Sequence, residues 1–174
     1  MSYSADTFVA GEQPTTAKWN KLWANDASFN DGTGIAAGAI TPSKLSSAAH
    51  TAYVATGEST TSSSYVDLTT TTDTVTITIG ANGLALVSIV GALQSNAGGS
   101  MSFMGFAISG ATTLAASDEY AIWNQSYDLN RSIKVGATFL MTGLTPGSTT
   151  FKAKYRADSN QATISERHIS VVPL

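Results

Sequence analysis

Cysteine is absent from the chain, and both charge and long hydrophobic runs are scarce. The lack of cysteine excludes a disulfide framework, a thiolate nucleophile and a cysteine zinc site. Charged residues make up 12% of the sequence, roughly half of the usual share. The net charge is −3 and the lysine and arginine residues are scattered along the chain. We therefore expect no nucleic-acid binding, which needs a basic stripe or patch.

The apolar segments are too short to cross a bilayer. The longest, Leu84 to Leu93, is about half of the ~20 residues that a membrane helix needs. Residues 1–13 contain neither the basic nor the apolar region of a signal peptide. We therefore expect no membrane insertion and a protein made in a cytoplasm.

The segment from Thr74 to Leu93 organises the predicted fold. Its first half alternates threonine with Val75, Ile77 and Ile79, the period of a strand with one buried face. Asn82-Gly83 predicts a tight reversal into a second antiparallel strand. That second strand, Leu84 to Leu93, is apolar on both faces and should lie in the middle of a sheet, covered by another sheet or another subunit.

Short strands separated by turn residues continue to the end of the chain. The predicted strands are Tyr65 to Thr69, Thr74 to Ile79, Leu84 to Leu93, Ser100 to Ser109, Glu119 to Trp123, Ile133 to Met141, Thr149 to Arg156, Gln161 to Ile164 and Arg167 to Val172. Thr145-Pro146-Gly147-Ser148 is typical of a tight turn. This spacing predicts an all-β, jelly-roll-like antiparallel β-sandwich over residues 65–174.

Residues 1–31 are interpreted as an arm that carries one short amphipathic helix. Pro14 suits a helix start, and Thr15 or Thr16 can cap it. Trp19, Leu22 and Trp23 then share one helical face. This stripe is too large for the helix to bury alone. It packs either on the chain's own body or its copies, or into a larger assembly as an anchor.

Residues 32–64 read as an extended linker, or collar, rich in small residues. Ile40 and Leu45 are isolated apolar points, and Pro42 prevents a continuous helix between them. Such points are best buried against symmetry copies around a common axis, which favours an oligomer.

The search for catalytic or metal-binding residues gives mostly negative results. His50 and His168 lack the spacing of metal ligands, and no serine lies in a nucleophile elbow. Asp118 and Glu119 are adjacent, so on a strand they would point to opposite faces. We expect no catalytic residues, no metal and no cofactor, and the role of this acidic pair stays open.

A polar loop bracketed by aromatic residues suggests a binding surface. Tyr120, Trp123, Tyr127 and Arg131 surround residues 124–130, and exposed aromatic rings beside polar groups commonly hold saccharides. The alternative is that these rings fill the core or a subunit interface.

Several short motifs resemble small fibre and tail proteins of tailed bacteriophages. They are Val9-Ala10-Gly11-Glu12 leading into Trp19-Asn20, then Gly34-Ile35, Gly38-Ala39-Ile40-Thr41 and Lys44-Leu45. The body of the chain, which closes on Arg167 to Leu174, is similar to their C-terminal β knobs. The resemblance implies a homotrimeric virion component, with the N-terminal arm bound to other virion proteins and the knob facing outward.

These observations together predict a non-enzymatic virion protein that acts in tail, neck or capsid as a short trimeric peg. Its head would touch a host-surface glycan or protein, with weak contacts combined by multivalency. Two alternatives stay open: a carbohydrate-binding module without a virion role, and a depolymerising tail-spike domain.

Overall fold

The computed structural model describes residues 15–20 and 49–174. Residues 16–20 form a helical turn that Thr15 caps, because the Lys18 amide donates to the Thr15 hydroxyl at 3.3 Å. The predicted helix start is thus confirmed, and Trp19 is half exposed. The other predicted anchoring residues, Leu22, Trp23, Ile40 and Leu45, lie outside the described residues.

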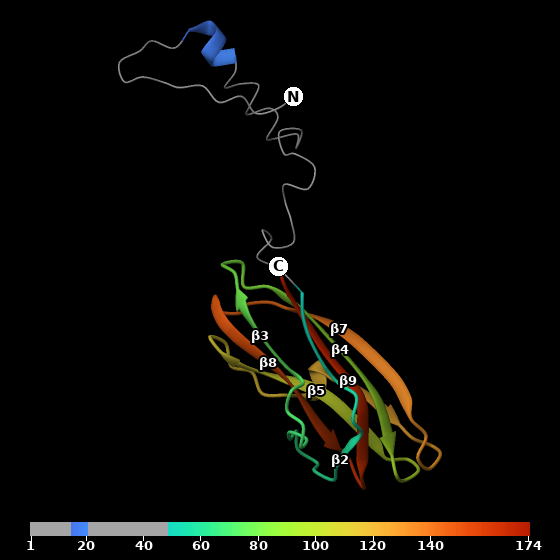
Figure 1. The fold of residues 1–174 in the computed structure, drawn as a ribbon. Coiled ribbons are helices and arrows are strands. Elements are labelled where there is room, and N and C mark those ends of the chain that lie inside the picture. Colours follow the sequence, from blue (N-terminus) through green and yellow to red (C-terminus); the bar gives the residue numbers. More distant parts are fainter. Residues whose placement is uncertain (1–14, 21–48) are drawn as a thin grey trace. The chain divides into compact units, whose positions relative to one another are not determined.

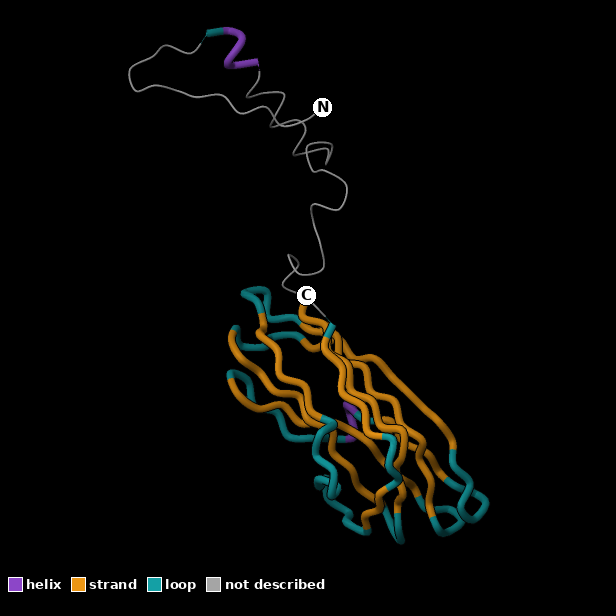
Figure 2. The backbone as a smooth tube through the Cα atoms, in the orientation of Figure 1, coloured by secondary structure: helices purple, strands orange, loops and turns teal. Residues whose placement is uncertain are grey.

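Residues 49–174 form an antiparallel β-sandwich, which confirms the predicted jelly-roll-like class (Figure 1). The strands are β1 (His50–Val54), β2 (Glu58–Thr60), β3 (Thr74–Ile79), β4 (Ala85–Ser95), β5 (Met101–Gly110), β6 (Ile122–Gln125), β7 (Ile133–Met141), β8 (Gly147–Ala157) and β9 (Ala162–Pro173). One sheet has the order β1-β9-β4-β7, with β2 also paired to β9. The other has the order β3-β8-β5-β6. Figure 2 shows the two layers, with loops joining them mainly at the ends.

Strand β4 lies inside its sheet, between β9 and β7, as its apolar sequence predicted. Its buried residues alternate with half-buried ones along the whole strand. The buried row, which includes Val87, Ile89 and Leu93, faces the other sheet and is fully covered. The opposite row is left partly accessible on the outside of the sandwich.

The predicted hairpin between β3 and β4 is wrong. Gly83 does make a turn, because its amide donates to Gly80 at 3.1 Å and its φ is +65°. However, β3 pairs with β8, whereas β4 pairs with β7 and β9. The turn therefore carries the chain from one sheet to the other, where β3 packs across the core toward β9 and β1, and β4 packs toward β5 and β6.

The predicted linker over residues 32–64 includes strands, so the head begins near residue 50 and not at residue 65. Strand β1 pairs with β9 from His50↔Val171 to Val54↔Arg167, and β2 pairs with β9 beyond that point. Residues 59–64, which include most of β2, are all serine or threonine, which fit an edge strand with one face in water, and β1 is only five residues long. Composition alone therefore did not distinguish them from a loop.

Two other predicted strands differ in extent. Tyr65 to Thr69 forms only an isolated bridge, Val66 to Tyr155. The predicted strand Glu119 to Trp123 begins instead as a 3₁₀ turn over Asp118–Tyr120, and β6 follows. The two short strands predicted at the end of the chain are one continuous strand, β9, in which Glu166 has a φ of +48°.

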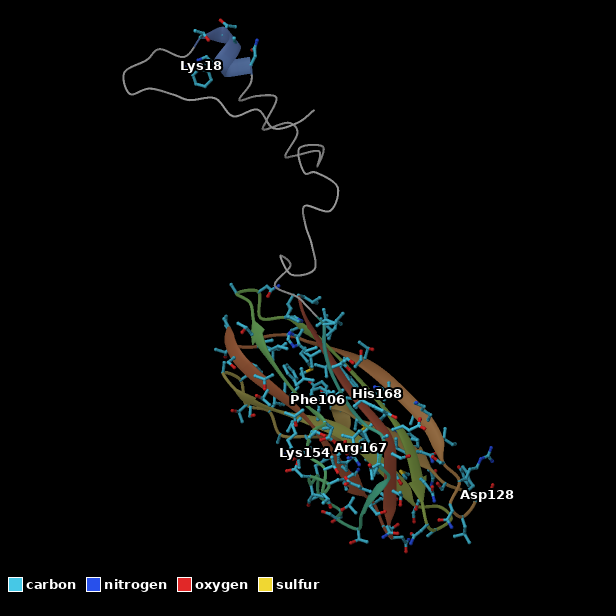
Figure 3. The ribbon with its side chains drawn as sticks, in the orientation of Figure 1. Lys18, Phe106, Asp128, Lys154, Arg167 and His168 are labelled. Carbon is cyan, nitrogen blue, oxygen red and sulfur yellow. The ribbon has the colours of Figure 1, made fainter. Side chains whose placement is uncertain are left out.

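The core between the sheets contains one buried cluster of charged and polar groups. Arg167 is fully buried, donates to the Glu58 carboxylate at 2.9 Å and lies 3.2 Å from the Asp73 carboxylate. The angle at Arg167 Nε does not satisfy a hydrogen bond, so the Asp73 contact is electrostatic. The buried Tyr155 hydroxyl also donates to Asp73. In Figure 3, Arg167 and Phe106 lie between the two sheets. Lys154 is on the outer face of the β3-β8-β5-β6 sheet, and His168 is on the outer face of the β1-β9-β4-β7 sheet.

Candidate functional site

The loop over residues 126–132, between β6 and β7, carries exposed aromatic and aliphatic side chains. Tyr127 is 82% exposed and Leu129 is 68% exposed. The base of the loop is fixed by backbone bonds, from Asn130 to Ser95 at 3.1 Å and from Gly99 to Ser126 at 2.7 Å. The loop therefore presents its apolar groups to solvent on a held backbone.

A cavity of about 210 Å³ lies at this loop. It is lined by residues 124–128 together with Arg131 and Ile133. Arg131 forms an ion pair with Asp128 at 3.5 Å, and both side chains are largely exposed. The structure thus places Tyr127 and Arg131, two of the predicted glycan contacts, at one cavity.

Trp123 lies next to this loop, on the outer face of β6. The alternation of β6 puts Ile122 and Asn124 inside, where the Asn124 amide donates to the Leu93 carbonyl at 3.0 Å. Trp123 and Gln125 therefore point outward, and Trp123 is 54% exposed. Gln125 in turn approaches the Tyr127 hydroxyl at 3.5 Å.

Tyr120, the fourth predicted contact, belongs to a different environment. Its ring lies 6.0 Å from Phe106 and 5.9 Å from Phe139, measured between centroids, so it packs against the core. The neighbouring Glu119 carboxylate, as hydrogen-bond acceptor and as a negative charge, raises the pKa of Tyr120. Tyr120 therefore agrees with the alternative that these aromatic rings fill the core, and not with a role as an exposed glycan contact.

The outer face of the second sheet carries an aromatic and cationic row that the sequence did not suggest. Phe103 pairs with Trp123 on one side and with Arg156 on the other, so the three side chains lie on one face. The Arg156 guanidinium stacks 3.5 Å above the centre of the Phe103 ring. Phe103 is buried as a result, although it is on the outside of the sheet.

Asp118 holds this row in place. Its carboxylate accepts two hydrogen bonds from Arg156, at 2.9 and 2.5 Å, and one from the Tyr65 hydroxyl at 2.9 Å. The guanidinium of Arg156 is the main reason that the pKa of Asp118 is lowered. Asp118 and Glu119 lie in a 3₁₀ turn and not on a strand, so the predicted placement on opposite strand faces does not apply to them.

The outer face of the first sheet is different in character. It carries aliphatic and hydroxyl side chains in register across the strands: Leu140, Leu86 and Val172 in one row, then Thr138, Ser88, Ser170 and Thr51 in the next. The hydroxyl groups bond to each other, Ser88 to Thr138 at 2.7 Å and Ser170 to Thr51 at 2.9 Å. This face also carries an ion pair, in which Lys134 Nζ lies 2.7 Å from Glu166 Oε2.

The comparisons with known proteins bear on the fold alone. No protein family model matches the sequence, and no curated protein matches it. Among solved structures, the Eiger TNF from S. frugiperda is 11% identical, with a TM-score of 0.48 over 74% of this chain and 92% of its own.

Two further solved structures are similar at lower TM-scores. A family two carbohydrate esterase from Cellvibrio japonicus is 13% identical, with a TM-score of 0.24 over 74% of this chain and 34% of its own. The CBM22-1 xylan-binding domain of Paenibacillus barcinonensis Xyn10C is 12% identical, with a TM-score of 0.28 over 73% of this chain and 94% of its own.

Among residues 15–20 and 49–174, no group of three His, Asp or Glu side chains is placed to hold a metal ion. His168 stacks on Tyr53 with ring centroids 4.2 Å apart. Within the same residues, no helix is both long and apolar enough to cross a membrane.

Proposed function

We propose that this chain is a structural and adhesive protein of a bacteriophage particle. In this proposal it is a homotrimer that is attached through its N-terminal arm to other virion proteins. Its β-sandwich head is exposed and binds a glycan on the host surface. The observation that carries the proposal is the division of the head into an aliphatic, hydroxyl-rich sheet face and a separate exposed aromatic surface.

The first of these surfaces supports self-association. The outer face of the β1-β9-β4-β7 sheet exposes Leu140, 56% accessible, beside the half-buried Leu86. Its hydroxyl groups and its Lys134–Glu166 pair are already satisfied within the sheet. Covering the aliphatic and hydroxyl part of this face with copies of itself removes apolar area from water, and the hydroxyl groups keep their hydrogen bonds.

The second surface supports an adhesive role. The chain enters the sandwich at one end, where His50 pairs with Val171 and the Leu174 amide donates to Leu84. The loop with Tyr127 and Arg131 lies at the other end of β4, at Ser95. An arm that is fixed at the first end would leave the aromatic loop free to meet a ligand.

A carbohydrate-binding module without a virion role is the second candidate, and the exposed Trp123 and Tyr127 favour it equally. Solution mass separates the two: a trimer supports the virion peg, whereas a monomer supports the independent module. A depolymerising spike is a weaker candidate, because Asp118 is engaged by Arg156 and Tyr65.

Adhesion of the intact particle to host cells tests the proposal directly. We expect Trp123→Ala and Tyr127→Ala to weaken adhesion while the oligomer keeps its size, because both side chains are exposed and away from the aliphatic sheet face. Thr76→Ala, on the outer side of β3, serves as a control. Unchanged adhesion in both aromatic variants would contradict a glycan-binding role for this surface.

A further inference from the structure

A second hollow, separate from the aromatic loop, lies on the outer face of the β3-β8-β5-β6 sheet. It has a volume of about 460 Å³ and is lined by Ser64, Tyr65, Ala107, Ala115, Ala116 and Lys154. Small side chains create the hollow, because three of these six residues are alanine. Gly105, next to Lys154 in the sheet, adds to it: a Cβ there would lie 3.2 Å from the Tyr65 ring.

Both walls of the hollow are held by hydrogen bonds to the sheet. On one side, Val66 exchanges two backbone bonds with Tyr155, each 2.9 Å long. On the other side, Leu114 exchanges bonds of 2.8 and 2.9 Å with Ile108. Asp118 then joins the walls by accepting from Tyr65 and Arg156. The hollow is therefore formed before any ligand arrives, which lowers the entropy cost of binding.

The charge beside the hollow is positive and incompletely balanced. Lys152 and Lys154 both bind one carboxylate, that of Asp67, at 3.0 and 2.8 Å. Arg156 is matched by Asp118. Three cations thus face two carboxylates, which leaves one positive charge at the edge of the hollow.

Lys152, Lys154 and Arg156 form a cationic row on β8. The basic residues among 49–174 are Arg131, Lys134, Lys152, Lys154, Arg156 and Arg167. Half of them lie at alternate positions of β8 and so face the same side of one sheet. The basic residues are scattered along the sequence, but the strand geometry brings these three together on one face.

We propose that this hollow binds the carboxylate-bearing sugar units of an acidic polysaccharide, with Lys154 facing the carboxylate. The alanine floor and the Tyr65 ring suit the apolar face of a sugar ring, and the unbalanced cation suits its acid group. One excess charge is too little for nucleic acid, whose binding requires many phosphate contacts. The inference rests on the proposed adhesive function and gives its ligand a chemical class.

Calorimetric titration of the full chain with oligogalacturonate tests the inference, with the fully methyl-esterified oligosaccharide as the matched neutral probe. We expect the acid form to bind at least about tenfold more tightly than the ester, because one charge-assisted contact is worth about a factor of ten. Equal binding of both forms, or binding of neither, would overturn the inference.

Three variants locate the site. Lys154→Gln should weaken binding of the acid form about tenfold, by the same reasoning. Ala116→Trp should abolish binding by filling the hollow, and its melting curve checks that it folds. Lys134→Gln removes a cation from the opposite sheet, away from the hollow, and should leave the affinity per chain unchanged even where it alters self-association. Equal losses in Lys154→Gln and Lys134→Gln, or equally tight binding of an oligonucleotide, would mean general polyanion attraction and would overturn the inference.

Failure of the inference and failure of the proposed function are distinguishable. If particles that carry Lys154→Gln and Ala116→Trp adhere as well as the wild type, the hollow is not the glycan site, and the proposed function still stands on the aromatic loop. If the wild-type chain binds oligogalacturonate as a solution monomer and is missing from particles, the ligand class is correct and the virion role is wrong.

Discussion

At the scale of single residues, Arg167 has the largest expected effect on stability. It is fully buried and is the counter-ion of both Asp73, which is buried, and Glu58, whose side chain is 14% exposed. Removing it leaves one buried and one partly buried carboxylate without a counter-charge. Burying an unpaired charge is costly, whereas exposed ion pairs contribute little.

We predict that Arg167→Met lowers the free energy of unfolding by about 3–5 kcal/mol, the range for breaking a buried ion pair. Urea unfolding measures the change. The matched control is Arg131→Met, whose pair with Asp128 is exposed and which should cost less than about 1 kcal/mol. Similar midpoints for the two variants would show that the buried cluster does not stabilise the head.

The same cluster predicts a dependence of stability on pH. Burial of Glu58 opposes ionisation, but the hydrogen bonds from Thr70 and Arg167 outweigh it, so the pKa of Glu58 lies below its ordinary value of 4.5. A carboxyl group with a lowered pKa stabilises the folded state above the pKa of the unfolded chain. That stabilisation is lost as the pH falls through the folded-state pKa.

We therefore predict that the melting temperature falls as the pH is lowered from about 5 toward 3, the side on which the lowered pKa lies. The Glu58→Gln variant should start less stable and lose less over this interval. Thermal melts at several pH values test this, with Glu119→Gln as a surface control. A wild-type slope that Glu58→Gln leaves unchanged would assign the pH dependence to other carboxyl groups.

At the scale of elements, the turn after β3 depends on glycine. The φ of Gly83 is +65°, and a Cβ there would lie 2.6 Å from the Leu144 backbone oxygen. Gly143 has a similar φ of +69°, but no atom lies within 4 Å of a Cβ built there. Replacing either glycine with alanine would therefore strain the backbone, but only at Gly83 would the new Cβ also clash with the backbone of Leu144.

We predict that Gly143→Ala costs about 1–2 kcal/mol of unfolding free energy, from the left-handed backbone alone. Gly83→Ala should cost clearly more, because the backbone of residue 144 must also move. Urea midpoints of the two variants make the comparison. If Gly83→Ala is no less stable than Gly143→Ala, the close approach to Leu144 is not maintained in solution.

Strand positions with clear alternation were predicted well from sequence. Both Thr74–Ile79 and Ile133–Met141 have the predicted limits. The pairing of strands was harder, because Asn82-Gly83 specifies a tight turn and does not say which sheet the next strand joins. In this sandwich the chain crosses between sheets there, so that β3 and β4 lie in different sheets and pair with different strands.

The candidate site was predicted only in part, for a physical reason. Trp123, Tyr127 and Arg131 lie at or beside the end loop, whereas Tyr120 turns toward Phe106 because a 3₁₀ turn precedes β6. The row on β8 has a signal in the sequence, since Lys152, Lys154 and Arg156 alternate. The partners Asp67 and Asp118 are far from β8 in the chain, and no local pattern could connect them.

At the scale of the whole molecule, the testable consequence is the oligomeric state. If the outer face of the β1-β9-β4-β7 sheet is covered by copies of the chain, a charge in its aliphatic row should prevent assembly, because the lysine would be buried without a partner. Leu140 lies in that row, opposite Leu86.

We predict that the wild-type chain has three times the monomer mass in solution and that Leu140→Lys has the monomer mass. Multi-angle light scattering measures both. Leu129, in the end loop, is also exposed to solvent, and Leu129→Lys should remain trimeric. A wild-type monomer, or a trimer that Leu140→Lys leaves intact, would show that this face is not the interface.

The pairing of β1 with β9 also has a mechanical meaning. The chain enters the sandwich at residue 49, at the end where His50 pairs with Val171. The loop with Tyr127 lies toward the opposite end. Tension between these two points would run along β1, so its ladder with β9 would be loaded in shear instead of being unzipped bond by bond. Behind this ladder, Arg167 ties Glu58 of β2 to the core, so a head pulled by its tether would resist detachment of its first strands.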